Sequence, residues 1–220
     1  MKSFILLFLI TFCGMSAKAI DCIGPTSASR FVVYLHGMDT PIPGNLEMRN
    51  RAALETVANK LNIRFALPRA TNDCPSNPNL KCWSWTEQDS IESVLEAINF
   101  SANICFPHLA FSLLGFSNGG YAVHKMMRKC STGNFTQMIS FGASGGWSKN
   151  DPQDLANCPL NLSMNIGSTD EANSSPSVAF YQYLKSINAQ VSYSKYLGGH
   201  ELTLDSLTQS LTTVRASPSN

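Results

Sequence analysis

Short apolar runs recur along the chain, and each is bounded by polar or turn-forming residues. The run Phe31–Leu35 is apolar throughout and stops at His36-Gly37. Runs of five to eight apolar residues between turn signals are typical of strands buried on both faces of a sheet. Phe31–Leu35 and Leu109–Phe116 are predicted to be strands of this kind, and the sequence predicts six strands in all: Phe31–Leu35, Ile63–Leu67, Leu109–Phe116, Gln137–Phe141, Leu162–Ile166 and Val191–Tyr196.

Between these runs the apolar residues recur at helical spacing. A Leu-Val-Ala-Leu stripe ends at Leu61, and similar stripes lie at 91–98, 119–129, 180–187 and 204–211. Residues three and four positions apart share one face of a helix, so each stripe predicts an amphipathic helix. Thr86 and Asp89 have capping-box spacing and predict the start of the second helix. Ser175-Pro176 predicts the start of the fourth.

Strands that alternate with helices over the whole chain predict one α/β domain. We expect a mostly parallel sheet of about six strands with helices on both faces, spanning residues 20–220.

The first residues are typical of a secretory signal peptide. Lys2 precedes an apolar run from Phe4 to Phe12, and Ala17-Lys18-Ala19 places small residues before a cut ahead of Ile20. The apolar run is too short for a membrane span, which needs about 20 residues. We therefore predict a signal peptide at 1–19 and a secreted or periplasmic protein without a stable membrane anchor.

Charge excludes one large class of partner. The 220 residues carry 16 basic and 15 acidic side chains, a formal charge of +1. Loss of Lys2 and Lys18 with the signal peptide leaves 14 against 15, or −1. Because no basic field exists to attract phosphates, we expect no nucleic-acid partner. The sequence does not predict an oligomeric state.

Six cysteines remain after cleavage, which in an oxidising compartment indicates disulfides rather than metal ligands. No cysteines have C-x-x-C spacing and the four histidines are scattered, so we expect no metal and no cofactor. Six cysteines allow fifteen pairings. Cys74 with Cys82, which bracket one loop, is the favoured pair, and Cys130 with Cys158 is a second candidate.

A candidate nucleophile lies between a predicted strand and a predicted helix. The segment Gly-Phe-Ser-Asn-Gly-Gly at 115–120 has the G-x-S-x-G pattern of a strand-turn-helix nucleophile, with Ser117 at the turn. The same pattern recurs at 142–146 around Ser144, but the residues that follow it do not predict a helix. Ser144 remains the alternative, and its loop is expected to form a wall of the site.

A reactive serine needs a base, and the base needs an acid to orient it. His200 follows the last predicted strand and so lies at the same sheet edge as Ser117. Asp170 follows the preceding strand, with Glu171 and Asp151 as substitutes. For the oxyanion we expect two backbone N–H donors, from Met38 after the first strand and from Asn118 after the nucleophile.

These motifs resemble the α/β-hydrolase superfamily over essentially the whole mature chain. The segments 115–120 and Cys82-Trp83-Ser84-Trp85 are similar to secreted esterases grouped with polyhydroxybutyrate depolymerases and feruloyl esterases. The resemblance implies a serine esterase with the triad Ser117, Asp170 and His200 and no cofactor. It implies a small-molecule or polymeric ester as substrate, with Trp83 and Trp85 as binding surface. The absence of a long insertion between Phe141 and Leu162 predicts no large lid.

Three alternatives remain open at this point. A peptidase or a thioesterase would use the same triad, and a secreted binding module would keep the fold without activity. Four Asn-x-Ser/Thr sequons are also present, and they are acceptors only in a host that glycosylates exported proteins. Their asparagines are Asn99, Asn134, Asn161 and Asn173.

Overall fold

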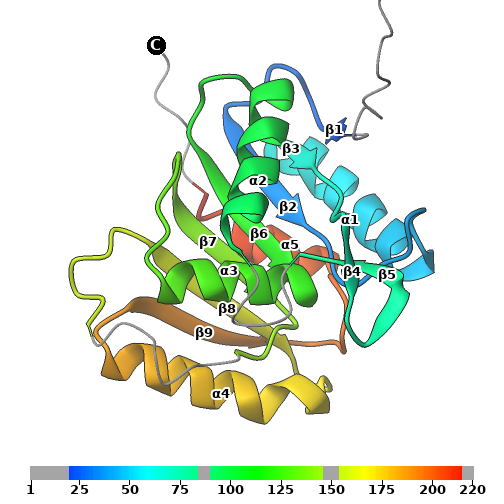
Figure 1. Ribbon diagram of the computed structural model, residues 1–220. Coiled ribbons are helices and arrows are strands. Elements are labelled where there is room, and N and C mark those ends of the chain that lie inside the picture. Colours follow the sequence, from blue (N-terminus) through cyan, green and yellow to red (C-terminus); the bar gives the residue numbers. More distant parts are fainter. Residues whose placement is uncertain (1–19, 84–89, 146–153, 215–220) are drawn as a thin grey trace, which may run out of the picture.

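The computed structural model describes residues 20–83, 90–145 and 154–214. Seven strands of these ranges form one sheet in the order β1-β3-β2-β6-β7-β8-β9 (Figure 1). All neighbours are parallel except β1, which runs antiparallel to β3. The strands are β1 (Asp21–Ile23), β2 (Arg30–Leu35), β3 (Ile63–Leu67), β6 (Phe111–Phe116), β7 (Phe135–Phe141), β8 (Asn161–Gly167) and β9 (Gln190–Tyr196).

The six predicted strands are thus confirmed, and the sheet gains β1 as an antiparallel edge. β1 has three residues only, too few for a recognisable pattern. A disulfide between Cys22 in β1 and Cys105 ties this edge strand to the end of a helix. The constraint comes from a residue 83 positions away, so the local sequence does not show it.

Helices cover both faces of the sheet, as predicted (Figure 1). In β2, Val33 and Leu35 pack into one core and Val32 and Tyr34 into the other, because successive side chains of a strand point to opposite faces. The first core includes side chains of α2, α3 and α4, and the second includes those of α1 and α5. The helices are α1 (Asn45–Leu61), α2 (Glu92–Cys105), α3 (Asn118–Arg128), α4 (Glu171–Ser186) and α5 (Leu204–Leu211).

The structure tests one of the two predicted helix starts. α4 begins at Glu171, and Pro176 lies inside it, so the predicted start at Ser175-Pro176 is wrong. Asp170 is the N-cap residue, because the turn that follows β8 leads directly into the helix. α2 begins at Glu92, whose backbone N–H is capped by the Ser90 hydroxyl at 3.2 Å. The predicted capping pair at 86 and 89 lies outside the described residues.

The segment predicted as a loop from 69 to 85 contains a small hairpin. β4 (Asn72–Cys74) and β5 (Asn77–Cys82) pair antiparallel, and the Cys74–Cys82 disulfide joins them. The segment is rich in Asn and Pro, which disfavour strands, so the pairing depends on the crosslink and on tertiary contacts. The third disulfide is Cys130–Cys158, so both candidate pairs from the sequence are present.

The parallel strands bring distant segments to one edge of the sheet. Leu35 pairs with Gly115, Phe116 with Phe141, and Gly167 with Tyr196. The residues that follow β2, β6, β7, β8 and β9 therefore meet at the carboxyl edge, where open α/β sheets place their sites. In the part of the chain that the structure describes, no helix is long and apolar enough to cross a membrane.

Candidate active site

Ser117 occupies a sharp turn between β6 and α3. Its backbone has φ 51° and ψ −115°, a conformation that a residue with a side chain adopts only when its surroundings enforce it. Its N–H donates to the Phe141 carbonyl at 2.9 Å, and its carbonyl accepts from the Tyr121 N–H at 3.0 Å. The strained turn is thus held from the neighbouring strand and from the first turn of α3.

Close backbone contacts explain the glycines around this serine. A Cβ atom on Gly115 would lie 2.4 Å from the Gly119 carbonyl oxygen, and one on Gly119 would lie 2.0 Å from that of Leu35. A Cβ atom on Gly120 would lie 2.5 Å from the Ala143 Cβ. The motif therefore has a steric cause, because any side chain at these positions would push the turn out of place.

His200 connects Ser117 to Asp170. Its Nε2 lies 3.0 Å from the Ser117 Oγ, and its Nδ1 lies 2.9 Å from the Asp170 Oδ2. The ring packs on Phe116, with 5.0 Å between ring centroids. The structure thus brings together three predicted residues that follow β6, β8 and β9. The two distances form the serine–imidazole–carboxylate chain in which an imidazole removes a hydroxyl proton.

Two tightly joined turns fix the acid and the histidine. The Thr169 N–H and hydroxyl both donate to the Gly198 carbonyl, at 3.0 and 2.9 Å. A Cβ atom on Gly167 would lie 2.2 Å from the Gly199 carbonyl oxygen, so the turns are in backbone contact. Asp170 itself is 5% exposed. A buried carboxylate in a hydrogen-bonded turn has little freedom to leave the imidazole.

The backbone of the loop after β2 passes beside Ser117. A Cβ atom on Gly37 would lie 3.1 Å from the Ser117 Cβ. The His36 carbonyl accepts from the Gly119 N–H at 3.0 Å, which ties this loop to the nucleophile turn. Met38, the predicted oxyanion donor, comes next in this loop, and Asn118 is the first residue of α3.

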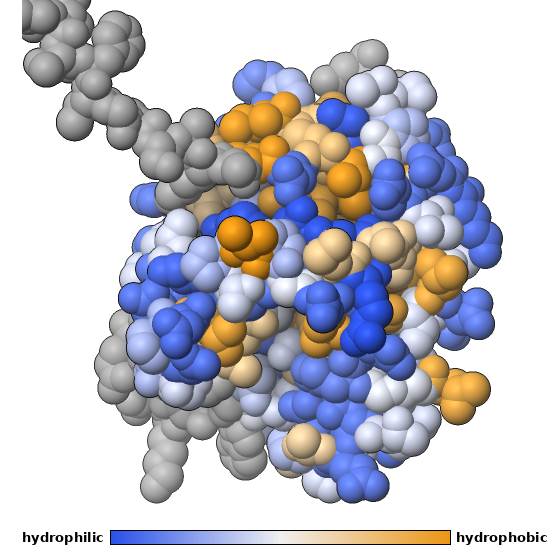
Figure 2. Space-filling view, turned by 90° about the vertical axis from the view of Figure 1, so that its right-hand side faces the viewer, coloured by the Kyte–Doolittle hydropathy of each residue, from blue (hydrophilic) through white to orange (hydrophobic). Residues whose placement is uncertain are grey.

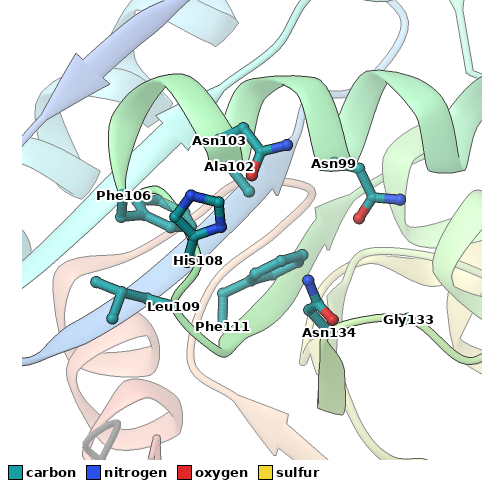
Figure 3. A pocket seen from close by; sticks show the side chains of 9 residues that line it. All are labelled: Asn99, Ala102, Asn103, Phe106, His108, Leu109, Phe111, Gly133 and Asn134. Carbon is teal, nitrogen blue, oxygen red and sulfur yellow. The ribbon is translucent and has the colours of Figure 1, made fainter. Parts of the chain in front are cut away.

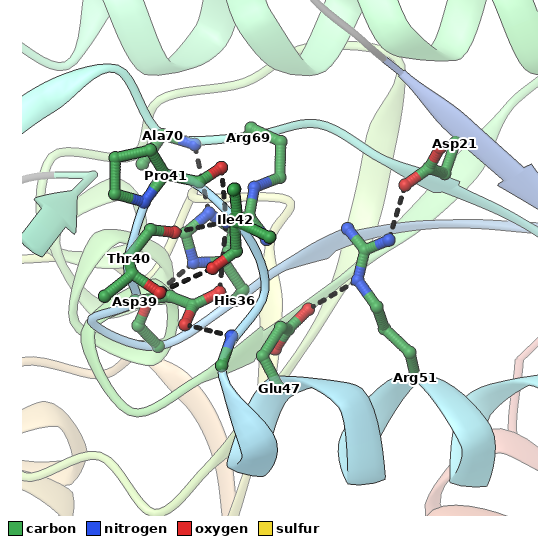
Figure 4. Close-up of polar contacts among 12 residues, drawn as sticks. Asp21, His36, Asp39, Thr40, Pro41, Ile42, Glu47, Arg51, Arg69 and Ala70 are labelled. Atoms are coloured by element: carbon green, nitrogen blue, oxygen red, sulfur yellow. Dashed lines mark hydrogen bonds and ion pairs between the residues drawn. The ribbon is translucent and has the colours of Figure 1, made fainter.

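The His36 ring anchors the same loop from the other side (Figure 4). Its Nε2 accepts from the Ala70 N–H at 3.0 Å, so the proton resides on Nδ1, which lies 2.5 Å from the Gly37 carbonyl oxygen. Burial, aided by the nearby Arg69 charge, lowers the pKa of His36 to about 4. The ring is therefore neutral near pH 7 and serves as a fixed hydrogen-bonding group.

Asp39 fixes the far side of the loop against the hairpin. Its backbone exchanges two hydrogen bonds with Lys81 of β5, and its Oδ1 accepts from the Gly44 N–H at 2.9 Å. Arg69 forms an ion pair with the Asp39 Oδ2 at 3.0 Å and also donates to the Thr40 carbonyl at 2.6 Å (Figure 4). Met38 thus lies between two anchored neighbours.

Comparison with known proteins finds matches among solved structures, but none among protein-family models or curated proteins. A carboxylesterase from Mesorhizobium loti has a TM-score of 0.64 and 19% identity, over 84% of this chain and 90% of that one. This match over most of both chains identifies the fold. The chain has the α/β-hydrolase fold.

Two further structures with this fold are similar. Acyl-protein thioesterase 2 of Zea mays has a TM-score of 0.62 and 17% identity, over 88% of this chain and 97% of that one. An α/β serine hydrolase of Xanthomonas campestris, described as having no lid, has a TM-score of 0.59 and 18% identity over 90% and 91%. The prediction of an α/β-hydrolase fold is confirmed. Within the described ranges, the hairpin is the one addition between β2 and β9 that forms strands outside the main sheet.

The rival serine lies in a different environment. The Ser144 Oγ is hydrogen-bonded to the Tyr121 hydroxyl, whereas the Ser117 Oγ is paired with an imidazole. Of the substitute acids, Glu171 is exposed on the first turn of α4, and Asp151 lies outside the described residues. The geometry therefore favours Ser117 and Asp170 over the alternatives.

The other histidines are placed away from the reacting groups. His124 is buried in α3, with its Nε2 2.8 Å from the Ser140 Oγ, and burial together with the Arg128 charge lowers its pKa to about 3. His108 lines a cavity of about 190 Å³ at the amino edge of β6, the opposite end of that strand from Ser117 (Figure 3). Neither histidine is in contact with Ser117 in this arrangement.

Trp83 has a structural position, which corrects the prediction that it offers a binding surface. The side chain is 3% exposed, and its indole N–H donates to the His36 carbonyl at 2.9 Å. Its backbone N–H donates to the Asn118 Oδ1 at 2.7 Å. A buried ring cannot stack on a ligand, and here it joins the disulfide-linked hairpin to the loop beside Ser117. Trp85 lies outside the described residues.

The surface around the hairpin and the start of α4 is mixed (Figure 2). Apolar patches alternate there with polar ones, without one continuous apolar band. Three large apolar side chains in the loops after β2 and β9 are nonetheless exposed: Met38 by 41%, Ile42 by 79% and Leu197 by 90%.

Among the described residues, no cluster of three or more potential metal ligands occurs.

Proposed function

We propose that the protein is a serine hydrolase that cleaves carboxylic esters through Ser117, His200 and Asp170. The observation that carries the proposal is the continuous hydrogen-bonded chain from the Ser117 Oγ through the His200 imidazole to the buried Asp170 carboxylate. The strained turn at Ser117 supports it, because strain of this kind is concentrated at functional sites. A binding module without activity would not need this series of hydrogen bonds from Ser117 through His200 to Asp170.

The proposed reaction has two halves. The Ser117 Oγ attacks the ester carbonyl while the His200 Nε2 takes its proton, and Asp170 holds the other imidazole proton on Nδ1. The tetrahedral intermediate then expels the alcohol, which takes the proton from His200, and an acyl-serine remains. His200 next removes a proton from water, the hydroxide attacks the acyl group, and the acid leaves as Ser117 regains its proton.

The oxyanion of each intermediate is proposed to bind two backbone N–H groups. Asn118 supplies one from the first turn of α3, where the helix dipole also favours negative charge. Met38 supplies the other, from the loop whose Gly37 backbone lies against Ser117. Its anchoring by His36, Asp39 and Trp83 supports this role, because donors that are already in place stabilise a developing charge most effectively.

Export and substrate class are part of the same proposal. Three disulfides are compatible with a protein that is exported from the reducing cytosol by the signal peptide at 1–19. An open site without a large lid suits short or soluble acyl groups. A thioesterase with the same triad is the second candidate, because one of the similar structures is an acyl-protein thioesterase.

A matched substrate panel tests the proposal. We expect the mature protein to hydrolyse soluble short-chain esters faster than the thioester and the peptide anilide of the same acyl group, with an initial burst of alcohol as the acyl-enzyme forms. Emulsified long-chain esters serve as the comparison for the open site. Faster thioester than ester cleavage would favour the second candidate, and no cleavage of any of them by the folded protein would contradict both.

A further inference from the structure

We propose that Asn173 is a positioning residue of this site, which orients the Asp170 carboxylate toward His200. The inference rests on the proposed function for its catalytic meaning, and on contacts that the three residues make for its geometry. Asn173 lies in the first turn of α4, three residues after Asp170. Residues with this spacing face each other on a helix, so the two side chains meet without further constraint.

The Asn173 amide contacts both oxygens of the carboxylate. Its Nδ2 donates to the Asp170 Oδ1 at 2.9 Å and to the Oδ2 at 3.2 Å. The same nitrogen lies 3.3 Å from the His200 Nδ1. Because Nδ1 carries a proton when it donates to Asp170, both nitrogens are donors, and both are directed at the carboxylate between them.

This arrangement selects one carboxylate oxygen for the imidazole. A carboxylate offers two equivalent oxygens, which exchange when the side chain rotates. The shorter of the two hydrogen bonds from the Asn173 amide holds the Oδ1, so the Oδ2 is left to accept from the His200 Nδ1. The amide dipole also stabilises the negative charge of a side chain that is only 5% exposed.

The geometry gives the sequon at 173–175 a meaning opposite to that of an acceptor site. The nitrogen to which a glycan would be attached is the one that holds the Asp170 carboxylate. A sugar on this atom would replace a donor hydrogen and stand beside His200. We therefore infer that Asn173 has to stay unmodified in the active protein.

One variant and one control test the role of Asn173. Asn173→Ala removes the donor, and we expect kcat to fall 10- to 100-fold with KM changed less than about threefold, the size of effect that loss of a supporting contact behind a reacting group produces. Ser175→Ala destroys the sequon at an exposed position without touching the amide, and we expect wild-type kinetics. Equal kcat values in all three proteins would overturn the inference.

The isosteric variant Asn173→Asp adds a readout that a general loss of packing does not move. A second carboxylate beside Asp170 and His200 favours the protonated imidazole, so the acidic limb of the kcat/KM profile moves to higher pH. Two further titratable groups lie close by, Tyr196 and Glu201. Burial and the Asp170 carboxylate raise the pKa of Tyr196, which stays neutral, and Glu201 is exposed and unchanged in the variant. An unshifted profile would count against the role.

A third measurement separates this inference from the proposed function. In proton NMR spectra, we expect the downfield His200 Nδ1–H resonance in the wild type and its loss or broadening in Asn173→Ala, with the unfolding temperature of both proteins recorded. This readout needs no turnover. If the wild type cleaves no ester yet the resonance depends on Asn173, the proposed function fails and the positioning role stands. If the resonance is the same in both proteins, the positioning role fails.

Discussion

Replacement of Ser117 with alanine is expected to lower kcat for ester hydrolysis by about 10⁶-fold, the loss found when the nucleophile of such a triad is removed. The variant keeps its histidine and acid, but His200 then has no hydroxyl to deprotonate at the 3.0 Å contact. Because alanine is smaller than serine, it introduces no steric clash in the turn, and we expect the fold to be retained. Rates of a soluble ester at saturating concentration, for wild type and variant, provide the check.

The rival serine supplies the comparison. Ser144→Ala removes a buried hydroxyl that is hydrogen-bonded to Tyr121, and we expect that variant to keep most of its activity. Loss of turnover in Ser144→Ala with little change in Ser117→Ala would reverse the assignment of the two serines. Circular dichroism of both variants guards against a fold defect.

Replacement of Asp170 with asparagine is expected to cost about 10⁴ in kcat, as for other triads in which the acid becomes an amide. The Asn173 amide donates to the side chain at position 170 and would hold the new carbonyl oxygen. The new NH₂ group would then donate a hydrogen bond to the His200 Nδ1. Nδ1 can accept this bond only when it carries no proton. The proton moves to Nε2, so His200 can no longer remove the proton of Ser117.

Glu171→Gln is the matched control for this variant, because it removes the neighbouring exposed carboxylate. We expect it to leave kcat within a factor of about two. Near-normal turnover in Asp170→Asn, together with loss in Glu171→Gln, would transfer the acid role to the neighbour. Both variants are compared with wild type at the pH of maximal kcat.

The fold follows from the sequence to the extent that it depends on local pattern. Strands β2, β3, β6 and β8 are mostly buried, so they appear as largely apolar runs in the sequence, whereas the edge strand β9 is partly exposed along its length. The edge strand β1 and the hairpin strands β4 and β5 are short and mostly polar. Their pairing depends on contacts with distant residues and on disulfides, which are not visible in a local pattern.

The candidate site is predictable where chain order fixes position. Ser117, Asp170 and His200 each follow a strand, and parallel strands bring such residues to one edge. The sequence marks Asn173 only as a sequon, because the predicted helix starts at Ser175-Pro176 and leaves the spacing of three from Asp170 outside it. The burial of Trp83 depends on how the hairpin packs on the loop after β2, which the sequence does not specify.

The most direct test of the central claim is a reaction of the mature wild-type protein with a fluorophosphonate, followed by mass spectrometry of its peptides. A serine whose proton is removed by a bonded imidazole attacks the phosphorus and expels fluoride, whereas ordinary serines do not react. We expect one adduct, on Ser117, which disappears in Ser117→Ala. An adduct on Ser144, or no adduct on the folded protein, would contradict it.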